Sequence, residues 1–131
     1  MQWLDREIHT LGLRYGLCLD EKAFKKELKR LGFTESIPFL KDGNAIATTH
    51  HLVNKHNKAY CSIVTMPQNP TASLEQHYAL LVHEGMHIWQ RHLESIGESN
   101  PSHEFAAYAM QNIAQNLMCA YRDMTKRKRR K

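Results

Sequence analysis

The sequence predicts a single α+β domain. Three observations favour this class: helical spacing of apolar residues near the N-terminus, short β-branched runs in the middle, and two long helical patterns after them. The chain has 131 residues, 42% hydrophobic and 24% charged, which is typical of one folded globular domain. We expect this domain to span residues 1–122, followed by a basic, disordered tail over 123–131.

Two helices are expected in the N-terminal quarter of the chain. The apolar residues from Trp3 to Leu11 have helical spacing, and either Gly12 or Gly16 would end this first helix. The second helix has Asp20 as its N-cap and Gly32 as its stop, with apolar residues at helical spacing between them.

The middle of the chain has the composition of a sheet. Short runs rich in Ile, Val, Thr and Tyr extend from Ser36 to Met66 and are broken by two turn-forming stretches. Ala45–Val53 and Ala59–Met66 predict a hairpin, and Ile37–Leu40 a shorter strand. Together they predict a small antiparallel sheet, which the prolines that follow would end.

Two further helices follow the predicted sheet. Ser73 and Gln76 have the spacing of a capping box, which indicates the start of a long helix. A loop is expected near Gly97, and Ser102 is the expected N-cap of a last helix from His103 to about Tyr121.

The long helix contains the pattern HExxH, formed by His83, Glu84 and His87. Residues four apart lie one turn apart on the same helix face, so both imidazoles can bind one zinc ion, and Glu84 is placed to reach a metal-bound water. Nine histidines in 131 residues raise the chance of coincidence. The position of the motif, inside a capped helix that follows a sheet, favours a zinc hydrolase.

A catalytic zinc site needs a third protein ligand. The downstream candidates are His92, Glu98, His103 and Glu104. His92 is rotated away from the two motif histidines, Glu98 lies in the expected loop, and the chain lacks the glycine and histidine of the longer pattern HExxHxxGxxH. Glu104 is the preferred ligand, because it begins a helix that can return antiparallel to the first.

The neighbours of Glu104 support this preference. A polar stripe at helical spacing consists of Glu104, Tyr108, Gln111 and Gln115. Nearby alanines would let two helices approach closely. The Tyr108 hydroxyl, one turn from Glu104, is a second catalytic candidate that would reach the metal or a substrate oxyanion.

Three segments carry a resemblance to a known family: Leu81–Gln90, Ile96–Glu98 and Glu104–Gln115. Here the chain resembles the zincin metallopeptidases, in particular the gluzincin branch, and is similar to small metallopeptidase-like proteins carried by phages and prophages. The resemblance covers about residues 60–118. It implies a minimal zincin-like domain with one zinc ion per chain, His83, His87 and Glu104 as ligands, and Glu84 as general base.

The expected activity is hydrolysis of peptide bonds in a peptide or protein substrate. The segment Ala59–Met66 is the expected edge strand to which an extended substrate would add. Two alternatives stay open: a non-catalytic zincin-fold protein that binds metal in a binding or regulatory role, and a nucleic-acid-associated protein that uses Lys126–Lys131 for weak, sequence-independent contact.

Charge and cysteine content bear on location. The formal net charge is +5, but the six residues Lys126–Lys131 are all basic, and the rest of the chain has 12 basic and 13 acidic residues. No apolar run is long enough to span a membrane. Cys18, Cys61 and Cys119 are odd in number and widely spaced, so we expect buried thiols and a cytoplasmic protein. The resemblance to small phage and prophage proteins implies that a phage or prophage encodes it. The oligomeric state is left open.

The remaining notable residues have structural interpretations. Trp89 is expected in the core, and Gly85 indicates a close approach by another backbone, since glycine costs about 1 kcal/mol inside a helix. Four other histidines have no usable ligand spacing: His50, His51, His56 and His77.

Overall fold

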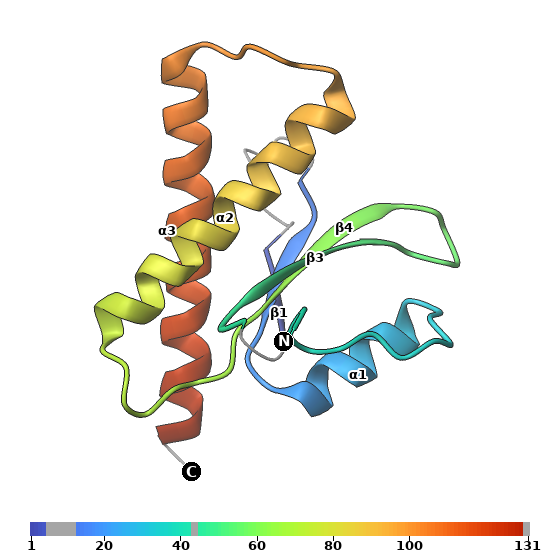
Figure 1. The fold of residues 1–131 in the computed structure, drawn as a ribbon, viewed down its shortest axis with the longest axis vertical. Helices are drawn as coiled ribbons and strands as arrows, with labels where there is room; N and C mark the ends of the chain where they lie inside the picture. Colours follow the sequence, from blue (N-terminus) through green and yellow to red (C-terminus); the bar gives the residue numbers. More distant parts are fainter. Residues whose placement is uncertain (5–12, 43–44, 130–131) are drawn as a thin grey trace.

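The computed structural model describes residues 1–4, 13–42 and 45–129. Helix α1 (Glu21–Arg30) covers one face of a small sheet, and helices α2 (Leu74–Ile96) and α3 (His103–Arg129) cover the other (Figure 1). This arrangement confirms the predicted α+β class. Each face of the sheet therefore has its own apolar core.

The sheet has four strands in the order β1-β2-β4-β3. Their bounds are Gln2–Trp3 for β1, Tyr15–Cys18 for β2, Thr48–Val53 for β3 and Tyr60–Thr65 for β4. The predicted hairpin is confirmed, because β3 and β4 pair antiparallel. The prediction of a wholly antiparallel sheet is wrong, since β2 pairs with β4 in parallel after the chain has passed through α1.

The position of β4 corrects a second expectation. The segment Ala59–Met66 was expected at an edge, but β4 lies between β2 and β3. Ile63 and Val64, which point to opposite faces, are both fully buried, as expected of a strand covered on both sides. The edge strand next to α2 is β3.

The N-terminus begins with a strand and not with the predicted helix. Gln2 and Trp3 pair with β2, and the rest of the expected helix, residues 5–12, lies outside the described residues. Gly16, one of the two expected helix stops, lies inside β2, where a Cβ would come within 2.8 Å of the Gln2 carbonyl oxygen. A side chain at this position would push β1 away.

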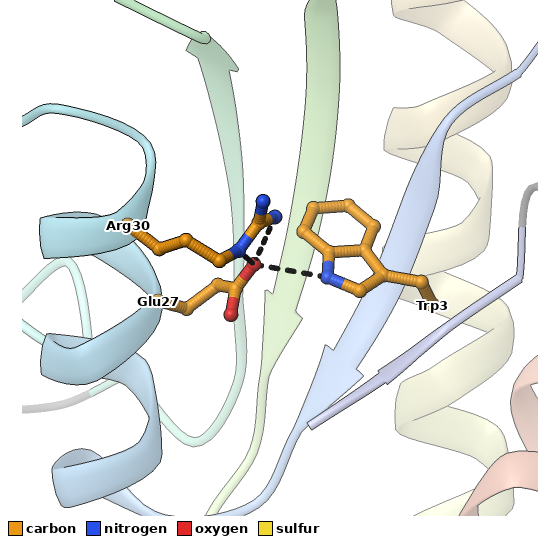
Figure 2. Close-up of polar contacts among 3 residues, drawn as sticks. All are labelled: Trp3, Glu27 and Arg30. Atoms are coloured by element: carbon orange, nitrogen blue, oxygen red, sulfur yellow. Dashed lines mark hydrogen bonds and ion pairs between the residues drawn. The ribbon is translucent and has the colours of Figure 1, made fainter.

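A polar cluster ties β1 to α1 (Figure 2). The indole N–H of Trp3 donates to Glu27 Oε1 at 3.0 Å, and Arg30 Nε donates to the same oxygen at 2.7 Å. The contact holds Trp3 beside α1. Because it joins residues 24 positions apart, no local sequence pattern could have indicated it.

Helix α1 begins and ends where the sequence predicts. Asp20 is the N-cap, and its Oδ1 accepts from the Ala23 N–H at 2.8 Å. Gly32 follows the helix with a φ of 89°, which a residue with a side chain rarely adopts. The buried residues Phe24 and Leu28 pack on the sheet.

The predicted strand Ile37–Leu40 is a loop in the structure. Ile37 and Phe39 pack against the core beneath α1. The carbonyl of Phe39 accepts from the side chain of Thr65 at 2.5 Å, so a side chain on β4 holds this segment without a strand ladder.

The larger core lies between the sheet and the two long helices. Its buried residues include Tyr15, Val64, Leu81, Trp89 and Ile113. Trp89 is 3% exposed, which confirms its expected place in the core. Gly85 faces α3, where a Cβ would lie 3.1 Å from Ile113 Cγ2. The expected approach by another backbone is therefore wrong, because side chains of α3 are what lie close to this glycine.

Helix α3 is longer than predicted. Ser102 is its N-cap, with Oγ accepting from the Phe105 N–H at 3.1 Å, but the helix continues past Tyr121 to Arg129. The segment 123–129, which the sequence placed in a disordered tail, is thus helical. Lys and Arg are good helix formers, and cations are favoured at a helix C-terminus.

No helix among the described residues is both long and apolar enough to cross a bilayer. Cys18 and Cys61 are buried in the core beneath α1, and Cys119 is half-buried in α3. Burial raises the pKa of the Cys18 thiol, which keeps this thiol protonated near neutral pH. Cys18 and Cys61 fit the expected buried thiols.

Candidate metal centre

The start of α2 fixes the position of the HExxH motif. Ser73 Oγ accepts from the Gln76 N–H at 3.1 Å, and Gln76 Oε1 accepts from the Ser73 N–H at 2.7 Å. This reciprocal pair is the predicted capping box. The helix ends at Gly97, which has a φ of 70°. The motif lies in the middle of this helix, where regular hydrogen bonding fixes its side-chain directions.

His83 and His87 lie one turn apart on an exposed face of α2. Their ring centroids are 5.1 Å apart and the rings meet edge to face. One ligand atom from each of His83, Glu84 and His87 lies within 4.8 Å of the others. The structure thus brings the three motif residues together in a group that could hold a metal ion.

Glu84 differs from the two histidines in its environment. Its side chain is 5% exposed and points towards β3, where Thr49 Oγ1 donates to Glu84 Oε2 at 2.9 Å. The same hydroxyl lies 3.2 Å from the Glu84 carbonyl oxygen. A buried carboxylate needs such a partner, because desolvation of an unpartnered charge is costly. Thr49 therefore fixes the orientation of the acid.

Sequence reasoning missed Thr49. Strand alternation can place residue 49 on the same face of the sheet as residue 51, but it gives no sign of which helix residue lies opposite. The contact joins residues 35 positions apart, so it exists only once β3 and α2 have packed.

His87 also has a partner that orients its ring. Its Nδ1 lies 3.2 Å from Gln90 Oε1. Because an amide oxygen can only accept, this contact places the proton on Nδ1 and leaves the Nε2 lone pair for a metal ion. Gln90 is three residues further along the same helix, a spacing at which side chains meet.

His51 adds a third imidazole at the border of the site. Burial lowers its pKa, and nearby Arg91 and His87 lower it further. Its Nδ1 lies 2.9 Å from Ser62 Oγ. A small groove lined by His51, Ile88 and Arg91 separates β3 from the second half of α2. The sequence offered no ligand spacing for His51, and only the packing of β3 on α2 brings it near the motif.

The predicted third ligand is not part of the metal-binding group. Glu104 and Tyr108 are exposed, and the α3 residues that face Gly85 of the motif are Met110, Ile113 and Leu117. Successive helix residues are rotated by about 100°, so Glu104 lies about half a turn away from Ile113, on the opposite face. Its role as a ligand, and the catalytic role of Tyr108, stay predictions.

The other downstream candidates also lie outside the group. His92 is half-buried and its ring lies 5.8 Å from that of Trp89. Glu98 is exposed after the end of α2, where Oε1 accepts from the Asn100 N–H at 3.3 Å. His103 is exposed at the start of α3. The described metal-binding group therefore comes from one turn of α2 alone.

The comparisons with known proteins give no family. No family model, curated protein or solved structure matches the chain. The resemblance to zincins therefore rests on the residues of three segments: Leu81–Gln90, Ile96–Glu98 and Glu104–Gln115.

A groove adjoins the metal-binding group on the side of the α2 N-terminus. It has a volume of about 690 Å³, within the range of about 300–1,000 Å³ typical of ligand sites. Its lining includes Ile46, Pro67, Ala79, Leu80 and His83. Since His83 belongs to both, a molecule in this groove would lie beside a bound metal ion.

Proposed function

We propose that this protein is a zinc-dependent hydrolase of peptide bonds. The observation that carries the proposal is the group His83–Glu84–His87, in which two exposed imidazoles lie beside a buried carboxylate that Thr49 holds in place. A structural role alone would not require two imidazoles and an oriented carboxylate to converge at the surface.

The residues fit zinc by ligand type. Imidazole nitrogens and carboxylate oxygens are ordinary zinc ligands, and His87 has the outer hydrogen bond that such ligands usually make. When bound, zinc lowers the pKa of a water towards about 7 and polarises a carbonyl group. His83 and His87 would hold the ion. The resemblance to gluzincins implies Glu104 as a third ligand, a role that its place on the exposed face of α3 does not support.

Glu84 is the proposed general base. The hydrogen bond from Thr49 occupies Oε2, which leaves Oε1 to accept a proton from the attacking water. The carboxyl group would then return this proton to the leaving amine. A fixed acid is useful here because proton transfer depends strongly on the distance and angle to the reacting water.

The surroundings favour an extended peptide as substrate. The edge strand β3 can accept another strand through its main chain, and Thr49 of this strand contacts the base. The adjacent groove offers apolar contacts at Ile46 and Leu80. We infer that the substrate adds to β3, in place of β4 as expected from the sequence, with an apolar side chain in the groove.

Two variants test the proposal. Glu84→Gln should retain one zinc per chain and lose cleavage of a peptide library, whereas His83→Ala should lose the zinc. Elemental analysis measures the metal and mass spectrometry the cleavage products. Zinc without cleavage in the wild-type protein would favour the non-catalytic alternative, and absence of metal from a folded, chelator-free preparation would overturn the site.

A further inference from the structure

The C-terminal end of the sequence concentrates the positive charge of the protein. Residues 126–131 are all Lys or Arg, and without them the chain has 12 basic and 13 acidic residues. The helix continues to Arg129, so the beginning of this basic run has a regular backbone. Arg122 and Lys126, one turn apart, are both exposed. These two cations are therefore presented by a helix attached to the domain.

A groove lies against this basic helix end. It has a volume of about 760 Å³ and is bordered by Arg122 and Lys126 of α3, Tyr78 of α2, and the amides of Gln68 and Asn69. These amide groups are exposed and can donate and accept hydrogen bonds. The groove thus combines two cations, an aromatic ring and amide groups. Arg122 Nε also forms an ion pair with Asp123 Oδ1 at 3.3 Å.

The aromatic ring in the groove packs against a neighbouring ring. Tyr78 is half-buried and packs edge to face against Tyr121, with ring centroids 6.1 Å apart. His77 stacks on the same Tyr121 ring at 5.4 Å, and its two nitrogens contact the Ser73 carbonyl and the Asn69 N–H. A preordered aromatic group loses little entropy when another ring packs on it.

We propose that this surface binds single-stranded nucleic acid. Arg122 and Lys126 would contact the phosphates, and Tyr78 would pack against a base in the groove. A duplex is disfavoured because its base faces are stacked and cannot reach a ring. An anionic membrane is disfavoured because residues 125–131 contain no apolar residue, and helices that bind membranes need an apolar face.

The experiment measures binding of a fluorescein-labelled 15-nucleotide oligo-dT to the full-length chain by fluorescence anisotropy at 50–200 mM salt. Arg122→Gln/Lys126→Gln should weaken binding at least tenfold. The slope of the logarithm of the binding constant against the logarithm of the salt concentration should become shallower by about 1.4, which is about 0.7 for each lost phosphate contact. Lys22→Gln/Lys26→Gln removes the same charge from α1, on the other side of the sheet, and should change affinity less than twofold.

A second pair of variants tests the groove. Tyr78→Leu should weaken binding about tenfold without changing the salt dependence, since it removes stacking and no charge. Tyr78→Phe should bind like the wild type, and thermal unfolding of both variants checks that the fold is retained. Equal losses of affinity in Arg122→Gln/Lys126→Gln and in Lys22→Gln/Lys26→Gln would overturn the proposal.

Competition decides between partners. Unlabelled oligo-dT should displace the probe, whereas polyglutamate and phosphatidylserine vesicles at equal charge should not. Displacement by polyglutamate or by vesicles as effective as that by oligo-dT would overturn the proposal in favour of an acidic protein or a membrane. All measurements use chelator-treated protein, so their outcome is independent of the proposed hydrolase activity.

Discussion

At the scale of single residues, the site depends on the partner of Glu84. This carboxylate is almost fully buried between α2 and β3, and Thr49 supplies its side-chain hydrogen bond. A buried carboxylate without a hydrogen-bond donor would be costly to keep in this position. The hydroxyl of Thr49 therefore satisfies one oxygen of the buried carboxylate and fixes its orientation.

Thr49→Val tests this positioning role. Valine has nearly the same shape but no donor, so we expect kcat to fall about tenfold while KM and zinc affinity stay unchanged. The free energy of unfolding should fall by about 1–3 kcal/mol, the usual cost of an unpartnered buried group. Steady-state kinetics on a library-derived peptide and urea unfolding measure both effects. Thr49→Ser keeps the hydroxyl and should behave like the wild type; an unchanged kcat in the valine variant would contradict the role.

Glu104 provides a second test at the residue scale. Because it lies on the exposed face of α3, away from the residues that contact α2, we expect Glu104→Gln to change zinc affinity less than twofold. His87→Ala should abolish binding under the same conditions. Competition with a chelating dye measures both affinities. A large loss in the glutamine variant would show that Glu104 is a ligand, as the resemblance to gluzincins implies, and that α3 moves when metal binds.

At the scale of elements, the packing of α2 on α3 positions the motif. Gly85 lies between Glu84 and His87 in the sequence, on the side of the helix that faces α3. Its lack of a side chain lets Ile113, which is 1% exposed, approach the backbone of α2. The same turn thus places two imidazoles at the surface and a carboxylate against the sheet, and its glycine leaves room for the side chains of α3.

Gly85→Ala should destabilise the protein despite the better helix propensity of alanine. The added Cβ would lie 3.1 Å from Ile113 Cγ2, and overpacking costs about 1–3 kcal/mol against a gain of about 1 kcal/mol. We expect a net loss of about 1 kcal/mol in urea unfolding. Ile113→Ala removes Cγ2 and should relieve the contact, so the double variant should lose less stability than the sum of the two single losses. Strict additivity would show that the contact is not tight.

At the scale of the whole molecule, stability should depend on pH through buried histidines. His50 lies beneath α1, with its ring 4.6 Å from that of Phe24 and its Nε2 3.0 Å from the Phe39 carbonyl oxygen. Burial lowers the pKa of His50 from its ordinary value of 6.5, and the Phe39 carbonyl and Glu84 oppose this shift. The folded protein therefore binds this proton less readily than the unfolded chain does.

The free energy of unfolding should consequently fall as the pH drops below 6.5, because the unfolded chain takes up a proton that the folded state rejects. The limiting slope for one histidine is about 1.4 kcal/mol per pH unit. Urea unfolding of chelator-treated protein at pH 5.5, 6.5 and 7.5 measures how the free energy of unfolding changes with pH. His50→Gln keeps a donor for the Phe39 carbonyl and should make the free energy of unfolding depend less steeply on pH. An equal slope in the wild type and the variant would contradict the assignment of this pH dependence to His50.

Much of the fold could be predicted from the sequence because its signals are local. The N-caps Asp20, Ser73 and Ser102 and the stops Gly32 and Gly97 act within a few residues, so pattern and spacing suffice to locate three helices. The hairpin and the convergence of His83 with His87 are also short-range. The zincin resemblance and the peptidase activity remain proposals.

The sequence by itself determined the α+β class, the hairpin and the HExxH turn, since each depends on residues that are close along the chain. Only the tertiary structure decided that Gln2–Trp3 forms a strand, that β2 joins β4 in parallel, and that Thr49 holds Glu84. The physical reason is the same in each case. These contacts join residues far apart in the chain, and their energies arise only when separate elements bury their apolar faces together.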